Sequence, residues 1–174
     1  LALGVALESP KICCWNTVVV PSRFDPSIDN STHLASETRS DPSRKPAAFW
    51  NTGQWCSART RLLVPRGGLE AAVEGLRAAA AGWPVGDPRD PATRLGPLAS
   101  RKQYETVQGF REIARRTALV VPLSAVPDGL PAKGFHAAPE LALGPPQDSP
   151  LVQQEIFGPL LTVQEYADLD DAIR

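Results

Sequence analysis

The spacing of apolar residues predicts two helices and the capped start of a third. In the first, four apolar residues recur every three or four positions and so share one helix face: Leu69, Val73, Leu76 and Ala80. Gly82 follows them as a stop signal. The second helix opens at a capping box, Ser100 with Gln103 three positions later. Its apolar face comprises Val107, Phe110, Ile113 and Ala114. Near the end of the chain, Asp168 is a cap residue for a further helix.

Short apolar runs bounded by turn residues predict strands. They are Arg61–Val64, which Pro65 would stop, Ala118–Leu123, Leu141–Leu143 and Leu160–Val163. Strand and helix patterns alternate along the chain, which indicates an α/β fold with a parallel sheet flanked by helices. The four prolines of the segment 83–97 predict an extended surface loop, and the residues GPPQDSP at 144–150 are typical of turns.

The first 46 residues differ in composition from the rest of the chain. Residues 21–46 are rich in Ser, Pro, Asp and Arg and have neither a helical nor a strand period. Such a segment cannot bury enough surface to offset the entropy lost on ordering. We therefore divide the chain into an atypical, partly disordered segment, 1–46, and an ordered domain, 47–174, and expect residues 17–45 to be mobile.

Composition and charge narrow the class of protein. The 174 residues are 43% hydrophobic and 21% charged, as in globular domains. With 18 Lys and Arg against 19 Asp and Glu, the net charge of −1 provides no basic field for nucleic acid or anionic lipid. No apolar run approaches the ~20 residues that span a bilayer, so we expect no membrane partner.

The cysteine pattern favours a reducing compartment, which is the cytoplasm or, as the alternative, an organelle. Of the three cysteines, Cys13 and Cys14 are adjacent and Cys56 is distant, which is not the pattern of a disulfide framework. His33 and His136 are isolated, and no cysteine pair has the spacing of a zinc site. We therefore expect no metal.

The stretch FWNTGQWCSAR at 49–59 is the most informative for chemistry. A lone cysteine between a glycine-containing turn and an expected helix start can form a thiolate, because helix amides and a nearby arginine lower a thiol pKa. The alternative is that Cys56 is a small core residue among aromatic side chains. An enzyme pairing Cys56 with His136 is a weaker alternative, because no Asn or Asp motif supports that histidine.

The segment FWNTGQWC resembles the catalytic-cysteine signature F-x-N-x-G-Q-x-C of the aldehyde dehydrogenase superfamily. Three further segments resemble the same family in the same order: VGDPRDPATRLGPLASRKQ, GFHAAPELAL and QQEIFGPLLTVQEYADLDDAI. The resemblance runs from about Ala47 to the end of the chain. It implies that residues 47–174 are an incomplete catalytic (cysteine) domain of an NAD(P)-dependent aldehyde dehydrogenase.

The resemblance also implies roles for four residues. Cys56 would attack the aldehyde carbonyl to give a thiohemiacetal. A hydride would then pass from the thiohemiacetal carbon to NAD or NADP, and water would hydrolyse the thioester left on Cys56. Glu155 falls where the family binds the nicotinamide ribose, and Phe157 where an aromatic ring backs the nicotinamide. Gln103 matches a helix-start glutamine that can reach the cofactor ribose. Each of the last three also has a structural interpretation: Glu155 as a solvated acid, Phe157 as core, and Gln103 as the second half of the capping box.

Several positions depart from the family pattern. Ala2 stands where the general-base glutamate of an L-E-L-G-G-K block belongs, and Gln154 replaces the first of two paired acids. Glu140 stands where threonine is usual, and residues 17–45 do not resemble the family. The nucleotide-binding half of the family has no counterpart in the chain.

Because the chain also lacks methionine and begins with leucine, we interpret it as a fragment of a longer enzyme. That enzyme would oxidise a small-molecule aldehyde to a carboxylic acid, and its full-length form would be a homo-oligomer. The isolated fragment would be inactive. The alternative is an inactive family member or splice product that acts as a structural or regulatory partner.

Overall fold

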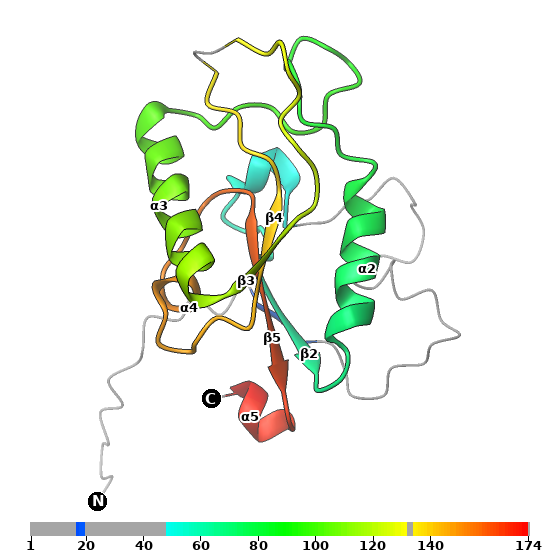
Figure 1. The fold of residues 1–174 in the computed structure, drawn as a ribbon, viewed down its shortest axis with the longest axis vertical. Coiled ribbons are helices and arrows are strands. Elements are labelled where there is room, and N and C mark those ends of the chain that lie inside the picture. Colours follow the sequence, from blue (N-terminus) through cyan, green and yellow to red (C-terminus); the bar gives the residue numbers. More distant parts are fainter. Residues whose placement is uncertain (1–16, 20–47, 132–133, 174) are drawn as a thin grey trace, which may run out of the picture.

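A computed structural model describes residues 17–19, 48–131 and 134–173. In these residues five strands form one sheet with the order β1-β2-β5-β4-β3, and helices lie between the strands along the chain (Figure 1). The strands are β1 (Thr17–Val19), β2 (Arg61–Pro65), β3 (Leu119–Pro122), β4 (Glu140–Leu143) and β5 (Leu160–Tyr166). The helices are the 3-10 helix η2 (Trp50–Gly53) and the α-helices α2 (Leu69–Ala80), α3 (Arg101–Thr117), α4 (Pro150–Gln153) and α5 (Leu169–Ile173).

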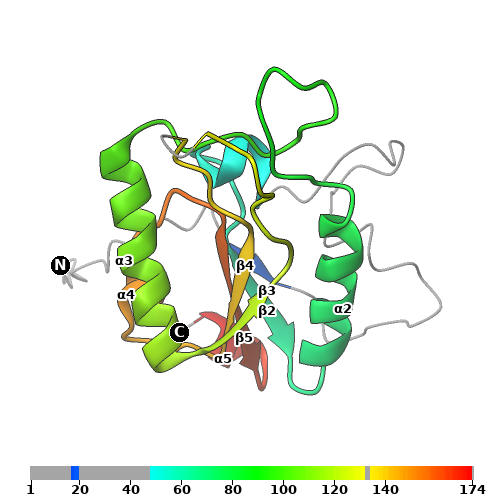
Figure 2. The same ribbon diagram turned by 45° about the horizontal axis from the view of Figure 1, so that its top comes forward.

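The two long helices cover opposite faces of the sheet (Figure 2). On one face, Leu62 and Val64 of β2 and Leu161 of β5 pack in one apolar cluster with Ala72 and Leu76 of α2. The cluster on the other face joins the remaining side of β4 and β5 to the apolar face of α3, and it includes Ala142, Leu160, Val107, Phe110 and Ala114. Side chains alternate between the faces along each strand, so β4 and β5 contribute to both clusters.

Both helices follow the predicted apolar period. The buried residues of α2 are Ala72, Leu76 and Ala80. The α3 helix begins after Ser100, whose hydroxyl oxygen accepts a hydrogen bond from the Gln103 backbone N–H at 3.1 Å. The capped start of the last helix is also confirmed, because the Asp168 carboxylate accepts a hydrogen bond from the Asp171 N–H at 2.9 Å.

One buried side chain of α3 does not belong to its apolar period. Arg111 is 6% exposed, its Nε lies 3.2 Å from a Glu140 carboxylate oxygen, and its Nη2 donates to the Ala138 carbonyl. Burial lowers the pKa of Arg111, while the charge of Glu140 opposes that shift. This ion pair joins α3 to the start of β4.

The predicted parallel sheet with flanking helices is confirmed for four of the strands described, and the sheet departs from it at one edge. β1, β2, β5 and β4 are parallel, but β3 pairs antiparallel with β4, Leu119 opposite Leu143. A parallel neighbour needs a crossover connection, usually a helix, and the described residues between β3 and β4 form no helix. The chain therefore returns antiparallel to β3 along β4, and the sheet is mixed.

Three further expectations need correction. Residues 17–19, expected to be mobile, form the edge strand β1 beside β2, while 1–16 and 20–47 lie outside the described residues. Residues 83–97 form a loop that folds back on itself, because Val85 pairs with Leu95 and both are buried. The end of GPPQDSP starts α4, where the Ser149 hydroxyl accepts from the Leu151 N–H at 3.3 Å.

Among the described residues, no helix combines the length and the apolar character that crossing a membrane requires.

Candidate active site

Two of the segments that carry the family resemblance lie at the amino ends of neighbouring strands. Cys56 precedes β2, which begins at Arg61, and Phe157 precedes β5, which begins at Leu160. β2 and β5 are parallel partners, with Arg61 opposite Thr162. Parallel neighbours begin at the same edge of a sheet, so two loops that are far apart in sequence meet there. We call residues 50–56 the cysteine loop and residues 155–158 the acid loop.

The backbone of the cysteine loop is held in an unusual conformation. Asn51, Thr52 and Gly53 all have positive φ angles, of 50°, 58° and 74°. A β-branched residue rarely adopts this conformation, which persists only where surrounding contacts hold it. Thr52 is 3% exposed, and its hydroxyl donates to the Gly96 carbonyl at 3.0 Å. Thus the end of the 83–97 loop holds the cysteine loop.

The two loops contact each other through glycines. A Cβ atom placed on Gly53 would lie 2.2 Å from the carbonyl oxygen of Gly158, and one on Gly158 would lie 2.3 Å from a methyl carbon of Val107. Real Cβ atoms do not approach other atoms so closely. Only glycine fits these two positions, and the cysteine loop, the acid loop and α3 therefore stack directly on one another.

The acid loop is tied to the first turn of α3 by Gln103. The side-chain amide nitrogen of Gln103 donates to the carbonyls of Ile156, at 3.1 Å, and Phe157, at 2.8 Å. Phe157 is half-buried and has a φ of 53°. The interpretation of Gln103 as the second half of a capping box is therefore wrong, because its side chain reaches across to the acid loop instead of back to Ser100. Glu155, by contrast, is exposed.

The surroundings of Cys56 correct two expectations. Cys56 is exposed, so it is not a small core residue. No helix starts after it: the chain passes through a turn into β2. The thiol therefore does not lie at a helix N-terminus.

A cluster of tryptophans beside Cys56 could not be predicted from the apolar pattern. The exposed fractions of Trp50 and Trp55 are 48% and 47%, and their ring centroids are 6.1 Å apart. Trp50 also meets the buried Trp83 edge to face at 6.3 Å. These three rings, with Asn51, Thr93 and Arg94, line a hollow. Two large exposed rings side by side are unusual on a protein surface and are typical of a binding site.

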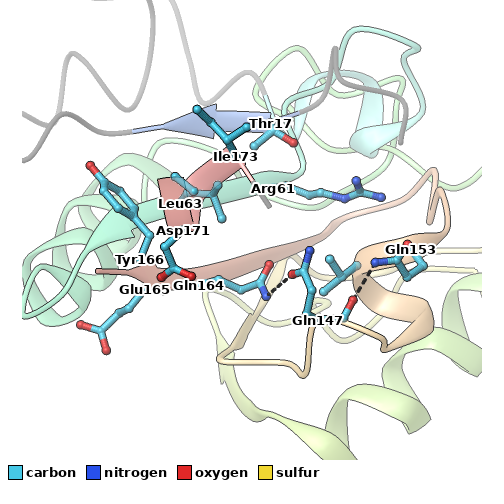
Figure 3. A pocket seen from close by; sticks show the side chains of 12 residues that line it. Thr17, Arg61, Leu63, Gln147, Gln153, Gln164, Glu165, Tyr166, Asp171 and Ile173 are labelled. Atoms are coloured by element: carbon cyan, nitrogen blue, oxygen red, sulfur yellow. Dashed lines mark hydrogen bonds between the residues drawn. The ribbon is translucent and has the colours of Figure 1, made fainter. Parts of the chain in front are cut away.

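A second hollow does not involve the predicted site residues (Figure 3). Its walls come from β1, β2, β5, α5 and the α4 region. Its glutamines bond within the protein: Gln164 donates to the Gln147 side-chain oxygen at 3.2 Å, and Gln153 donates to the Gln147 carbonyl at 2.7 Å. The described residues contain no group of three or more His, Cys, Asp or Glu that could hold a metal ion.

Comparison with known proteins agrees with this arrangement. The family model described as "Aldehyde dehydrogenase family" matches residues 44–174, and the chain therefore belongs to the aldehyde dehydrogenase family.

Particular relatives show how much of the family the chain covers. The chain is 40% identical over 126 residues to the aminoacetaldehyde dehydrogenase of Pseudomonas aeruginosa, an alignment that covers 72% of this chain and 25% of that protein. A Mycobacterium tuberculosis aldehyde dehydrogenase, solved in complex with NAD+, is 34% identical with a TM-score of 0.66, covering 73% of this chain and 26% of that one. The gamma-glutamyl-gamma-aminobutyraldehyde dehydrogenase of Burkholderia cenocepacia is 31% identical with a TM-score of 0.72, covering 91% and 29%. The chain thus spans about a quarter of the length of such relatives.

Proposed function

We propose that this chain carries the nucleophile and part of the nicotinamide site of an NAD(P)-dependent aldehyde dehydrogenase, in residues 47–174. The observation that supports this most directly is the close approach of Gly53 and Gly158. It joins the loop that carries Cys56 to the loop that carries Glu155 and Phe157. A nucleophile and a cofactor site must adjoin for a hydride to pass between them.

The reaction proceeds in two stages. The Cys56 sulfur attacks the aldehyde carbonyl carbon, and the carbonyl oxygen becomes the oxygen of a thiohemiacetal. Glu155 and Phe157 would hold the nicotinamide end of NAD(P), which would supply the acceptor for the hydride of that carbon. The oxidised carbon would remain bonded to the Cys56 sulfur as a thioester. Water then cleaves the thioester to release the carboxylic acid and the thiol. The backbone N–H of Cys56 donates to the oxygen as charge develops, a contribution of ~3 kcal/mol for one such donor.

Two side chains of the acid loop fit the nicotinamide end of the cofactor. Phe157 is half-buried and its backbone is held in place by Gln103, so its ring can back a flat aromatic group. Glu155 is exposed beside it, and its carboxylate can accept hydrogen bonds from ribose hydroxyls. The NAD+ complex of the Mycobacterium relative supports NAD as the first cofactor to test.

A catalytically inactive family member that acts as a structural or regulatory partner is the second candidate. The observation that favours it is Ala2, at the place of the family's general-base glutamate. Without a base, hydrolysis of the thioester would be slower by ~10²–10⁴-fold. Ala2 lies outside the described residues.

The nucleophilic stage can be tested in this chain without a cofactor. The chain is mixed with aminoacetaldehyde labelled with ¹³C at its carbonyl carbon, because the Pseudomonas relative bears the name of that substrate. We expect a new thiohemiacetal carbon resonance that is absent in the Cys56→Ser variant. The same resonance in Cys56→Ser, or its loss only in variants of Cys13 or Cys14, would contradict the role of Cys56.

The oxidation stage is tested by NADH or NADPH formation. We expect no turnover by this chain alone, because no segment of it matches the nucleotide-binding half of the family. Cys56→Ala is the control. Turnover that depends on Cys56 would contradict this expectation and imply a cofactor site elsewhere in the chain.

A further inference from the structure

The side-chain amide nitrogen of Gln103 donates its hydrogen bonds within the protein. Its nitrogen has two N–H donors, and two carbonyl acceptors, those of Ile156 and Phe157, lie within hydrogen-bond distance. A cofactor ribose could therefore receive no hydrogen bond from this nitrogen unless a bond to the acid loop were first broken. The resemblance alone implied a direct contact between this glutamine and the ribose, and the geometry leaves only the amide oxygen for such a contact.

The carbonyls that Gln103 binds belong to a strained turn. Phe157 has a φ of 53°, a conformation that is unfavourable for a residue with a Cβ atom. Two successive carbonyls can converge on one nitrogen only if the backbone turns between them. The Gln103 amide therefore stabilises the turn that positions the Phe157 ring and lies directly after Glu155.

Gln54 makes the corresponding contact for the cysteine loop. Its side-chain oxygen accepts a hydrogen bond from the Ala99 N–H at 2.8 Å, and its nitrogen donates to the Asn51 carbonyl at 3.3 Å. Asn51 begins the run of residues with positive φ. The glutamine two residues before Cys56 thus ties the left-handed part of its loop to residue 99.

Both glutamine contacts converge on residues 99–103. Two hydrogen bonds hold this segment in place. Directly before it, the Leu98 N–H donates to the Phe135 carbonyl at 2.9 Å, and within it the Ser100 hydroxyl accepts from the Gln103 N–H at 3.1 Å. Leu98 is 2% exposed.

We infer that residues 99–103 are a common brace for the cysteine loop and the acid loop, and that Gln103 acts on the site chiefly as a positioning residue, through its amide nitrogen. The inference rests on the proposed function for the roles of the two loops. The Gln103 amide acts as a donor and the Gln54 amide chiefly as an acceptor, and this difference makes the inference testable.

The experiment compares substitutions that keep one half of each amide. Gln103→Lys keeps a donor but loses the acceptor, and Gln103→Glu keeps an acceptor, which a ribose hydroxyl could use, but loses both donors. The readouts are amide hydrogen exchange at Phe157 and Gly158 and the strong intraresidue N–H to Hα NOE that a positive φ gives at Phe157. Gln108→Glu and Gln108→Lys, on the same helix, are matched controls because Gln108 contacts neither loop in any hydrogen bond described above.

We expect Gln103→Glu to speed exchange at both amides by about 10- to 100-fold and to weaken the NOE, while Gln103→Lys stays within about threefold of the unsubstituted chain. An unchanged acid loop in Gln103→Glu, or equal loss in Gln103→Lys, overturns the inference. If Gln103→Glu also speeds hydrogen exchange at the Val163 amide in the core strand β5, the whole fold is lost in that variant. The Gln54 variants then provide the test of the inference. Gln54→Glu should then preserve the Thr52 amide protection that Gln54→Lys loses, and equal behaviour of these two overturns the brace.

A titration with NAD+ separates this inference from the proposed function. If NAD+ shifts the Glu155 and Phe157 resonances in the unsubstituted chain, the cofactor role of the acid loop is supported. If it does not, the missing nucleotide-binding half accounts for the result, and the exchange measurements still decide on the brace. If NAD+ binding survives in Gln103→Lys and is lost in Gln103→Glu, both hold. The reverse pattern would identify Gln103 as a direct acceptor for the ribose and overturn the inference.

Discussion

The amino edge of β2 and β5 and the body of α3 adjoin each other, yet they are built differently. At the strand edge, glycine backbones touch, several residues have positive φ, and side-chain amides hold the loops. Along α3, a regular apolar face packs on the sheet and one buried ion pair joins it to β4. The first region leaves no space for an added atom, whereas the exposed side of α3 is open to substitution. Backbone strain is therefore concentrated in the two loops at the strand edge, and such strain is characteristic of functional loops.

The largest effect is expected from Gly53→Ala. Its Cβ would lie 2.2 Å from the Gly158 carbonyl oxygen at a φ of +74°, so backbone clash adds to conformational strain. We expect a loss of more than ~3 kcal/mol in the free energy of unfolding, measured by urea denaturation. Gly129→Ala is the control, because that glycine has a φ of +85° with nothing within 4 Å and should lose only ~1–2 kcal/mol. Equal losses would mean that the two loops are not in close contact.

Arg111→Ala should have the next largest effect. It leaves the Glu140 carboxylate without its partner, where that side chain is only 14% exposed. Removal of one member of a buried ion pair typically costs ~3–5 kcal/mol. Replacing both members, in Arg111→Met with Glu140→Leu, should restore most of this stability in the same denaturation assay. The exposed Arg115→Ala on the same helix should change stability by less than ~0.5 kcal/mol, and a loss as large as that of Arg111→Ala would argue against the ion pair as the cause.

Gly109→Ala should stabilise the protein. Gly109 is exposed in the middle of α3, with nothing within 4 Å of an added Cβ. Alanine is favoured over glycine in a helix by ~0.8–1.0 kcal/mol, so the melting temperature should rise by a few degrees. The same change at Gly158, where the Cβ would lie 2.3 Å from a Val107 methyl carbon, should lower it. If both substitutions shift the melting temperature in the same direction, the contrast between the regions fails.

The smallest effect concerns the ion pair between Asp87 and Arg89 in the 83–97 loop. Hydrogen bonds from the Arg89 side chain, 2.6 Å away at the closest atoms, lower the pKa of Asp87 from 3.8 to about 2. Because the pKa is lower in the folded protein, the contribution of the pair to stability is present above pH ~4 and is lost as the pH falls toward 2. NMR titration of the Asp87 carboxyl should show this pKa. Arg89→Gln should return it toward 3.8, and an unchanged pKa in that variant would exclude Arg89 as the cause.

Local pattern was sufficient for much of the fold. The apolar periods of α2 and α3, the strands β2 to β5, and the caps at Ser100 and Asp168 could be predicted because each depends on residues within a few positions of one another. Membership of the aldehyde dehydrogenase family also came from the sequence, through four co-linear motifs. The match of the family model to residues 44–174 confirms it.

Tertiary structure decided what depends on distant partners. The antiparallel β3, the return of Leu95 to Val85 and the burial of Arg111 against Glu140 each join residues that no local pattern relates. The same holds for Gln103. In the sequence its position beside Ser100 indicates a helix cap, but in the fold its side chain finds two carbonyls of the acid loop. A side chain takes the partners that the parallel alignment of β2 and β5 brings within reach, and that alignment is set by the packing of the whole sheet.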